Sequence, residues 1–518
     1  MAVSFLKPCE VAEMVKDGDV VATGGFVGSC CPESLTGYLE KRFNETGHPK
    51  NLTLLYAAAQ GDCTGKGADH FAHEGMTKRV IGGHWNLAPK LGKLAIENKI
   101  EAYNLPQGTI SELFRDIAGK RIGTITHVGL NTFVDPRIEG GKLNDISKED
   151  VVKLINVEGE ERLLYKSLPI DVCFIRGSFA DENGNITLER EVASLEATSM
   201  AQACKNSGGI VVVQVEKVVA SGTLDPRLVK IPGIYVDIVV VSNAREHEQS
   251  FGSDYNPALT GEIRVPITSI EKAPLNIRKI IARRAALELK PNTVVNLGIG
   301  IPEVISMVAN EEGIGKYMTL TVEAGPVGGV PEGGGKFGAS INPEAILDQP
   351  YQFDFYDGGG ADIAFLGLAQ VDQSGNLNVS KFGPRIVGCG GFINISQNAK
   401  QVIFCGTFTT SGLKVSTGDG KLEILQEGKL IKFLKEVEQI TFSGRYAQKT
   451  KQKVMYITER AVFELKEDGL YLTEIAPGVN LKKDILELME FVPKMEGQPK
   501  LMDECIFYDK PMGLKNNN

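Results

Sequence analysis

The sequence lacks the motifs of several large classes of enzyme. It contains neither G-x-x-x-x-G-K-[ST] nor G-x-S-x-G, which argues against a P-loop nucleotide hydrolase and an α/β-hydrolase. No histidine follows His247, so a Ser–His or Cys–His catalytic pair cannot lie within the second half of the chain. The 9 cysteines include no C-x-x-C pair, and the adjacent Cys30 and Cys31 fit small turn residues better than a redox pair.

Long apolar runs and long runs of like charge are also missing. The longest apolar runs, 210–213 and 238–241, are strand-sized, whereas about 18 residues are needed to span a bilayer. Lys7 and Glu10 interrupt the short apolar start, which does not fit a signal peptide. The 65 acidic and 56 basic residues give a net charge of −9, with no basic patch for nucleic acid. These features predict a soluble, cytoplasmic protein with reduced thiols and no nucleic-acid or membrane partner.

Glycine is abundant, with 58 residues among 518, against roughly 7% in an average chain. The glycines show no three-residue period and proline numbers only 23, which excludes collagen. Hydrophobic residues make up 42% of the chain, enough for substantial cores. Since one core rarely grows past about 250–300 residues, we expect at least two domains with many sharp turns.

Short Val- and Ile-rich runs alternate with amphipathic stretches along the chain. Runs such as 210–215, 294–296 and 401–405 are continuous rather than alternating, which predicts a parallel sheet covered by helices on both faces. The clearest helix is expected from Pro274 to Leu289, with isoleucines on one side and Arg278, Lys279 and Arg283 elsewhere. The predicted fold class is therefore α/β.

The chain also repeats itself once. The segment 17–24 resembles 290–298, and Pro32-Glu33 recurs as Pro302-Glu303. Two further pairs share an offset of 191 residues: 171–174 with 362–365, and 184–186 with 375–377. Similar order and a constant offset indicate two related open α/β domains.

We place these domains at residues 1–260 and 261–518. The polar stretch 244–262 is the expected linker. Because the first half is longer, an insertion is expected between about Gln60 and Asp150.

Two local patterns are similar to ligand sites, but neither is complete. The segment 333–338 matches G-x-G-x-x-G, yet it follows Pro331 and runs into Pro343 instead of opening a helix, so a dinucleotide site is disfavoured. His70 and His73 could bind a metal, but no third histidine or cysteine stands at ligand spacing, and a solvated polar surface is favoured. We therefore expect no metal.

The densest group of candidate catalytic residues lies in the second half. Residues 317–323 are expected to form a strand that ends in Glu323, followed by an irregular loop over 324–331. A carboxylate at the carboxyl end of such a strand is well placed for catalysis, although a solvated strand end is an equal alternative. Glu332 is a weaker rival inside the glycine-rich loop.

A second glycine cluster covers Gly388-Cys-Gly-Gly-Phe392, ahead of a helix-like stretch at 393–399. Backbone N–H groups in such a loop can bind an anion or an oxyanion, and a simple tight turn is the alternative.

Several short motifs, in order along nearly the whole chain, resemble family I coenzyme A transferases, in particular the single-chain bacterial acetate/propionate (short-chain acyl) CoA-transferases. In the first half these are 20–26, 104–109 and 133–137 with Gly140-Gly141. In the second half they are 295–302, 321–325, 355–360, 375–383 and 388–392. Ala324 stands where serine would be expected in close relatives. The resemblance implies two NagB/RpiA-like α/β domains with the active site between them.

By this resemblance Glu323 is the nucleophile, and its carboxylate forms a glutamyl-CoA thioester through a mixed anhydride. The Gln107 side chain and the Gly391 backbone N–H are then the oxyanion-hole donors. The reaction would be ping-pong, with coenzyme A as a substrate and covalent intermediate and no tightly bound cofactor. The expected CoA contacts are Gly298, Ile299, Gly300, Ile301, Pro302 and, more weakly, Asn378.

The function predicted in this way is transfer of CoA between a short-chain acyl-CoA and a carboxylic acid such as acetate or propionate. An acyl-CoA hydrolase on the same scaffold and a non-catalytic CoA-binding protein are the alternatives. The resemblance also suggests a homodimer or homotetramer. The preferred acid is not readable, since a methylene or hydroxyl is worth only about 1–3 kcal/mol in an apolar site.

Overall fold

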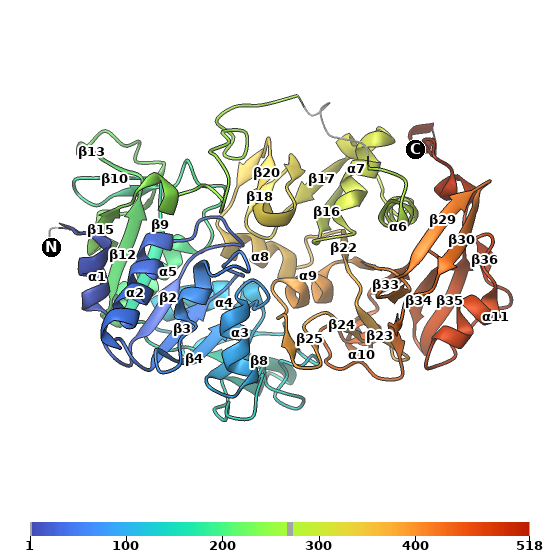
Figure 1. Ribbon diagram of the computed structural model, residues 1–518, viewed down its shortest axis with the longest axis horizontal. Coiled ribbons are helices and arrows are strands. Elements are labelled where there is room, and N and C mark those ends of the chain that lie inside the picture. The colour runs from blue at the N-terminus through green and yellow to red at the C-terminus, as the bar shows by residue number, and fades with distance from the viewer. Residues whose placement is uncertain (1–2, 267–272, 517–518) are drawn as a thin grey trace. The chain divides into compact units, whose positions relative to one another are not determined.

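The computed structural model describes residues 3–266 and 273–516 and groups them into two compact units (Figure 1). The first unit contains the described residues up to Val265 together with Val322–Asp354 and Phe382–Asn394. The second contains the described parts of Pro266–Thr321, with Phe355–Lys381 and the chain from Ile395 onward. The units thus differ from a division at residue 260, because two segments of the second half pack with the first unit. The two related halves at 1–260 and 261–518 stay a prediction.

The first unit is built on a parallel sheet with the order β1-β15-β12-β9-β2-β3-β4-β5. Its strands are β1 (Ser4–Phe5), β2 (Val20–Thr23), β3 (Leu52–Tyr56), β4 (Thr77–Gly82), β5 (Glu101–Asn104), β9 (Val172–Arg176), β12 (Ile210–Val215) and β15 (Ile238–Val241). The chain moves outward from β2 to β5 and then in the opposite direction from β9 to β15. Open α/β sheets bind ligands beyond the carboxyl ends of strands near such a reversal.

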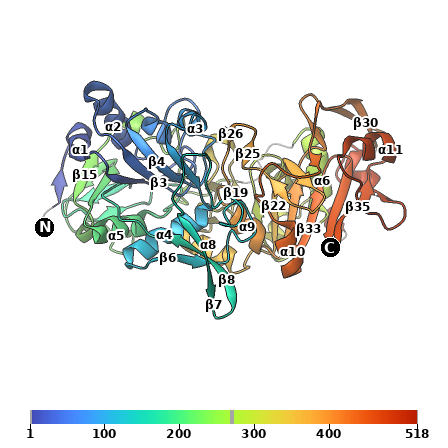
Figure 2. The same cartoon turned by 90° about the horizontal axis from the view of Figure 1, so that it is seen from below.

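Helices cover both faces of this sheet. They are α1 (Pro8–Met14), α2 (Glu33–Thr46), α3 (Pro89–Ile96), α4 (Gln107–Ala118) and α5 (Ala197–Ser207). Figure 2 shows α1, α2 and α3 on one side of the sheet and α4 and α5 on the other. Apolar residues of α1, α2 and α3 form one core with the buried faces of β2, β3 and β9. The continuous apolar strands therefore lie in a covered parallel sheet, as predicted.

Smaller elements complete the first unit. One antiparallel sheet is formed by β6 (Gly123–Thr126), β7 (Val152–Val157) and β8 (Glu160–Lys166). A second small sheet contains β10 (Phe179–Asp181), β11 (Ile186–Thr187), β13 (Lys217–Val219) and β14 (Val229–Ile231). The segments from the second half of the chain supply β18 (Pro326–Val327), β19 (Val330–Pro331), β20 (Ser340–Ile341), β21 (Ala345–Ile346) and the start of α8 (Gln349–Asp357) and α9 (Phe392–Asn398).

The second unit has the strand order β17-β16-β22-β27-β33-β34-β35-β36. These strands are β16 (Thr293–Leu297), β17 (Met318–Thr321), β22 (Ile363–Gly367), β27 (Gln401–Cys405), β33 (Lys453–Ile457), β34 (Ala461–Lys466), β35 (Gly469–Ile475) and β36 (Lys500–Leu501). Pairing is parallel from β17 to β33 and antiparallel from β33 to β35. Its helices are α6 (Ile277–Ala286), α7 (Glu303–Glu311), α10 (Gly444–Thr450) and α11 (Leu481–Asp484).

The internal repeat is visible in matching elements of the two units, which confirms two related α/β domains. Strands β10 and β11 start at residues 179 and 186, and β23 (Gln370–Asp372) and β24 (Leu377–Asn378) start at 370 and 377, which preserves the offset of 191. The strand β2 leads into α2 at Glu33, and β16 leads into α7 at Glu303.

Two local expectations need correction. The helix expected from Pro274 to Leu289 begins at Ile277, because the Asn276 side chain accepts hydrogen bonds from the N–H groups of Arg278 and Lys279 and acts as the N-cap. The stretch 244–262 is not a free linker, since it lies within the first unit and buries Gln249 and Ser250.

None of the helices in residues 3–266 and 273–516 is both long and apolar enough to span a membrane.

Candidate active site

Glu323 lies in a turn that follows β17, two residues beyond the end of the strand. The turn is closed by hydrogen bonds from Gly325 N–H to Val322 O, 3.0 Å, and from Val322 N–H to Pro326 O, 2.9 Å. Gly325 has a φ of +129°, and a β-carbon at this position would overlap Leu347 O. The strand expected over 317–323 is therefore shorter and ends at Thr321, and Glu323 stands in a turn that requires glycine.

The neighbouring Ala324 is fully buried in an apolar cluster that includes Phe26, Leu195 and Val322. A serine at this position would place a hydroxyl among these apolar groups. Alanine instead adds a methyl group to the cluster, so the departure from the family pattern affects the packing behind Glu323.

The glycine loop 387–391 is fastened to the residues that follow β4. Gly390 N–H donates to Gly83 O at 2.7 Å, and Trp85 N–H donates to Val387 O at 2.8 Å. Cys389 N–H donates to the side-chain oxygen of Asn104 at 2.9 Å. These bonds join segments far apart in the sequence within the first unit, and they fix the loop conformation.

Gly391 lies directly against the Glu323 carboxyl group. A β-carbon on Gly391 would overlap Glu323 Oε2, so only glycine permits this approach. Gly391 immediately precedes α9, and N–H groups at the start of a helix have no partner within it. The position of Gly391 is thus suited to offering a backbone N–H beside Glu323.

Gln107 is the first residue of α4 and contacts the same loop. Its backbone N–H donates to Gly390 O at 2.9 Å, and the next N–H, of Gly108, donates to the side-chain oxygen of Asn394 at 3.2 Å. The side-chain Nε2 of Gln107 is buried and has no hydrogen-bond partner among the described residues. A buried donor without a partner is costly, and an oxyanion would supply one.

The carboxyl group of Glu323 is surrounded by protein, although part of the residue stays accessible. Burial raises its pKa to about 7. Desolvation disfavours the charged form, so the carboxylate that does form is more basic and less solvated than an exposed one. Glu323, Gln107 and Gly391 come from both halves of the sequence and meet within the first unit.

His84 is a neighbour of this loop that the sequence motifs did not identify. It lies between Gly83 and Trp85, which hold the glycine loop, and the side-chain Cδ2 lies near Gly390. Only its proximity in the structure identifies it, because a lone histidine forms no spacing pattern.

The other predicted ligand residues lie in the second unit. In the loop 298–302, Ile299 is 56% exposed and Gly300 has open space around it. Asn378 is fully buried, and its side chain donates to Gln370 Oε1 and Lys381 O within its own hairpin. The loop therefore offers accessible surface, whereas the polar atoms of Asn378 are used internally.

Glu332 and the G-x-G-x-x-G segment form a β-hairpin. The segment contains only a short 3-10 turn, Gly334–Lys336, between β19 and β20. The glycines therefore do not open an α-helix, which a dinucleotide-binding fingerprint requires.

His70 takes part in a cluster of hydrogen-bonded carboxylates. Its ring nitrogens lie 2.7 Å from Glu33 and 2.6 Å from Glu40, and His73 lies 2.7 Å from Glu40. His70 is largely buried and not a solvated surface residue. Burial opposes its protonation, but the hydrogen bonds to Glu33 and Glu40 raise the pKa of His70 to about 9. Among the described residues, no group of three or more His, Cys, Asp or Glu is arranged to hold a metal.

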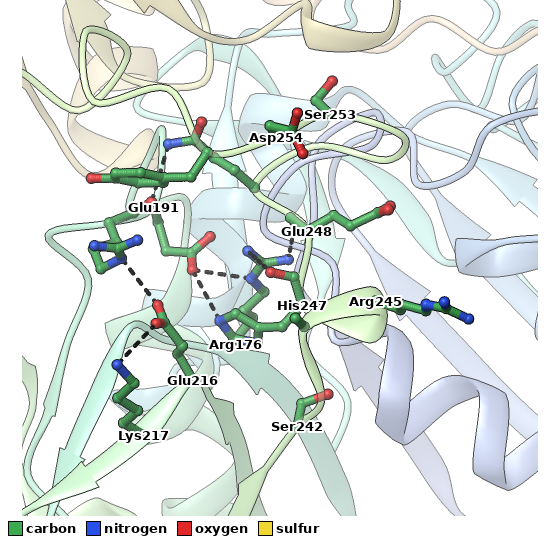
Figure 3. Close-up of a pocket in the computed structure, with 14 residues that line it drawn as sticks. Arg176, Glu191, Glu216, Lys217, Ser242, Arg245, His247, Glu248, Ser253 and Asp254 are labelled. Atoms are coloured by element: carbon green, nitrogen blue, oxygen red, sulfur yellow. Dashed lines mark hydrogen bonds and ion pairs between the residues drawn. The ribbon is translucent and has the colours of Figure 1, made fainter.

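A cavity of about 570 Å³ lies at the carboxyl ends of β9, β12 and β15 (Figure 3). Arg176 pairs with Glu191 at 3.0 Å, and Arg190 lies 3.0 Å from Glu216. Glu323 does not line this cavity. The charges of Arg176, Glu191 and Glu216 thus pair within the wall of this cavity.

Comparison with known proteins tests the resemblance to the coenzyme A transferases. A sequence model described as Coenzyme A transferase matches residues 9–242. The caffeate CoA-transferase of Acetobacterium woodii is 46% identical over 516 residues, which cover 98% of each chain. The acetate CoA-transferase YdiF of Escherichia coli (strain K12) is 46% identical over 495 residues, 96% of this chain and 93% of that protein.

Solved structures agree with the sequence relatives. The apoenzyme of the acyl-CoA transferase YdiF from Escherichia coli O157:H7 superimposes with a TM-score of 0.94 at 44% identity, covering 99% of this chain and 97% of that one. The thioester complex of the same enzyme with CoA has a TM-score of 0.93 at the same identity and coverage.

Proposed function

Because the chain belongs to family I of the coenzyme A transferases and is a CoA-transferase, we propose that it exchanges CoA between short-chain acyl-CoAs and carboxylic acids such as acetate and propionate. The observation that carries the proposed mechanism is the placement of Gly391 against the Glu323 carboxyl, next to Gly390, which Gln107 contacts. The side-chain Nε2 of Gln107 is buried without a hydrogen-bond partner among the described residues. The similarity to an acetate CoA-transferase supports the choice of short-chain acids.

The proposed reaction begins when the Glu323 carboxylate attacks the thioester carbonyl of the acyl-CoA. The C–S bond breaks, which leaves a mixed anhydride and the CoA thiolate. The thiolate then attacks the glutamyl carbonyl, releases the carboxylic acid as its anion and forms the glutamyl-CoA thioester. A second carboxylate runs the same steps in reverse, so the kinetics are ping-pong. The thioester complex known for YdiF supports this intermediate.

Each attack builds a tetrahedral oxyanion that needs hydrogen-bond donors already in place. The Nε2 group of Gln107 and the backbone N–H of Gly391 are the proposed donors. Gln107 is fastened through its backbone to Gly390, so both donors belong to one hydrogen-bonded unit. Rigid donors of this kind need little reorganisation as the charge develops.

The raised pKa of Glu323 has a consequence for pH dependence. The nucleophile must be ionised, so the first half-reaction should accelerate as the pH rises through about 7. A carboxylate with little hydration is also a stronger nucleophile than one in water. No general base is required, because the attacking group carries no proton.

Coenzyme A is proposed to lie along the loop 298–302. Its accessible Ile299 offers apolar contact, and Gly298 and Gly300 permit close approach of the pantetheine arm. CoA is here a substrate and a covalent intermediate.

The decisive experiment is incubation of the protein with acetyl-CoA in the absence of an acceptor. Mass spectrometry should find a CoA adduct on the peptide that contains Glu323, and Glu323→Ala should abolish both the adduct and transfer. Glu323→Asp is the matched test of geometry: a displacement of about 1 Å should cost at least about 100-fold in rate. Full transfer activity in Glu323→Ala would rule out this mechanism.

Product analysis separates a transferase from a hydrolase on the same scaffold. Free CoA and free acid should accumulate slowly without an acceptor and give way to acyl exchange when acetate or propionate is added. Caffeate should be included among the acceptors, because a caffeate CoA-transferase is equally similar in sequence. A kcat/KM for caffeate above those for acetate and propionate would contradict the short-chain assignment while leaving CoA transfer intact.

A further inference from the structure

The backbone of His84 is held on both sides by the glycine loop of the Glu323 site. Gly83 O accepts a hydrogen bond from Gly390 N–H, and Trp85 N–H donates to Val387 O. The carbonyl of His84 itself accepts a hydrogen bond from the Tyr56 hydroxyl at 2.9 Å. The side chain of His84 is therefore attached to a rigid segment.

His84 and Gln107 border the same side of Gly390. The position where a β-carbon on Gly390 would stand lies 3.7 Å from His84 Cδ2 and 3.6 Å from Gln107 Oε1. The next residue, Gly391, touches Glu323. Two side chains from different segments thus converge beside the residues that hold the nucleophile.

The ring nitrogens of His84 lie in different surroundings. Nδ1 is buried and has no hydrogen-bond partner among the described residues, whereas the residue as a whole keeps some accessible surface. Nε2 is bonded to Cδ2, so it belongs to the ring edge beside Gly390. The tautomer with its proton on Nε2 keeps the N–H donor out of the buried side, where it would find no acceptor.

His84 is uncharged at neutral pH, because burial lowers its pKa to about 4. No charged side chain contributes to this shift. A neutral imidazole can donate a hydrogen bond without forming an ion pair with Glu323, and an ion pair would lower the pKa and the nucleophilicity of that carboxylate.

We propose that His84 is a third hydrogen-bond donor of the Glu323 site, which binds the carbonyl oxygen of the acyl group through Nε2–H beside Gln107. This inference rests on the proposed function, since it assigns a role in the same transfer reaction. The neutral donor strengthens as the carbonyl becomes an oxyanion, so His84 acts mainly on the transition state.

Three substitutions test this role through the position of the donor. Gln at position 84 can place an amide N–H near the Nε2 position, Asn reaches only the Nδ1 position, and Ala removes the donor. We expect His84→Ala and His84→Asn to slow single-turnover formation of the Glu323 adduct by about 100-fold or more, with a smaller change in KM, and His84→Gln to restore most of the rate. His48→Ala, at an exposed histidine paired with Asp17, is the control and should leave the rate unchanged.

Adduct formation at the wild-type rate in His84→Ala would overturn the inference. Equal losses of the adduct-formation rate in His84→Gln and His84→Ala would also overturn it, provided that thermal unfolding of both variants is unchanged. Should His84→Ala unfold, the comparison between His84→Gln and His84→Asn decides, because both keep a polar side chain. Failure of the proposed function gives a different result, namely no adduct at Glu323 in the wild-type protein.

Discussion

Two equivalent connections of the internal repeat have opposite characters. The first runs from β2 to α2 through residues 24–32, and the second runs from β16 to α7 through residues 298–302. Every residue of the first is buried. In the second, Ile299 is 56% exposed and a β-carbon on Gly300 would meet no atom within 4 Å. The same strand–loop–helix unit is thus closed in one half and open in the other.

Local packing explains why the first connection is closed. A β-carbon on Gly25 would lie 2.7 Å from Cys31 Sγ and 3.0 Å from Gln60. Ser29 hydrogen-bonds to Ser250 at 2.5 Å. Burial raises the pKa of the Cys31 thiol far above its usual value, so this cysteine serves packing and not redox chemistry.

The first residue of each following helix shows the same difference. Glu33 opens α2 and is buried, with hydrogen bonds from Gly67 N–H at 3.1 Å and with His70 at 2.7 Å. Glu303 opens α7, and its Oε1 is buried without a hydrogen-bond partner among the described residues. Burial raises the pKa of Glu303. Glu33 is thus fully hydrogen-bonded in the first half, whereas one carboxylate oxygen of Glu303, at the equivalent position, has no hydrogen bond within the described part of the chain.

The two halves thus share a strand–loop–helix unit, but the loop of that unit is packed in one half and accessible in the other. The closed connection supports the sheet, and the open one keeps the surface that we assign to CoA. Four substitutions, from the largest expected effect to the smallest, test this division.

Gly25→Ala should have the largest effect. Its φ of +145° is unfavourable for alanine, and the new methyl group would overlap Cys31 and Gln60. Strain and overpacking together should lower the free energy of unfolding by about 4 kcal/mol. In the matched variant Gly298→Ala, the nearest atom to the new methyl group is Leu366 Cδ2 at 3.1 Å, so the loss in urea unfolding should be only about 1 kcal/mol. Equal losses of unfolding free energy in Gly25→Ala and Gly298→Ala would contradict the difference in packing between the two loops.

His70→Ala should destabilise the closed connection in a pH-dependent way. Because the folded-state pKa of His70 is raised to about 9, its contribution is complete below about pH 6.5 and is lost as the pH rises through 9. The shift of the pKa from 6.5 to about 9 corresponds to about 3 kcal/mol. Unfolding of variant and wild type should be compared between pH 6 and 10. A difference that does not shrink at alkaline pH would contradict the assigned pKa.

Ile299→Ser tests the open connection through binding. The side chain is mostly exposed, so unfolding should be unchanged, but the KM for acyl-CoA should rise about 3- to 10-fold through lost apolar contact. Leu425→Ser, at a leucine that is 59% exposed on another strand, is the control. If the KM for acyl-CoA is similar in Ile299→Ser, Leu425→Ser and the wild type, the loop 298–302 does not contribute to CoA binding.

Glu303→Gln should have the smallest effect. Since burial raises the pKa of Glu303, its ionised form opposes folding, and this penalty grows as the pH rises from acid toward neutral values. The glutamine variant should therefore be more stable at pH 7, by about 0.5 kcal/mol, and equal to wild type in acid. Thermal unfolding at pH 4 and pH 7 measures this difference. Destabilisation at pH 7 would show that the attraction of the carboxylate to the Gly300 N–H and to Arg278 outweighs the cost of its burial.

The repeated hairpins and the central strands could be predicted from short sequence patterns. The offset of 191 residues located matching strands because each unit folds the same short segments into the same hairpin. The continuous apolar runs located central parallel strands because both faces of such strands are buried. The predicted start of α6 at Pro274 was wrong, because the helix begins after the Asn276 cap. The side chain of Asn276 accepts the first free N–H groups of the helix.

The site was predictable only in part. Family motifs pointed to Glu323, Gln107 and Gly391, and the structure brings these residues together through the bonds of the glycine loop. His84 carries no such signal, because its place beside the glycine loop depends on backbone hydrogen bonds between its neighbours and residues about 300 positions away. The same holds for His70, whose acidic partners precede it by 30 residues or more.

The sequence by itself determined the repeat, the α/β class and the glutamate that follows a strand, because these depend on residue type and short spacing. Tertiary structure decided which of two equivalent loops is closed, which histidine borders the glycine loop next to Glu323, and how strongly Glu323 holds its proton. Those properties depend on desolvation and on contacts between distant segments, and both arise only when the chain is packed.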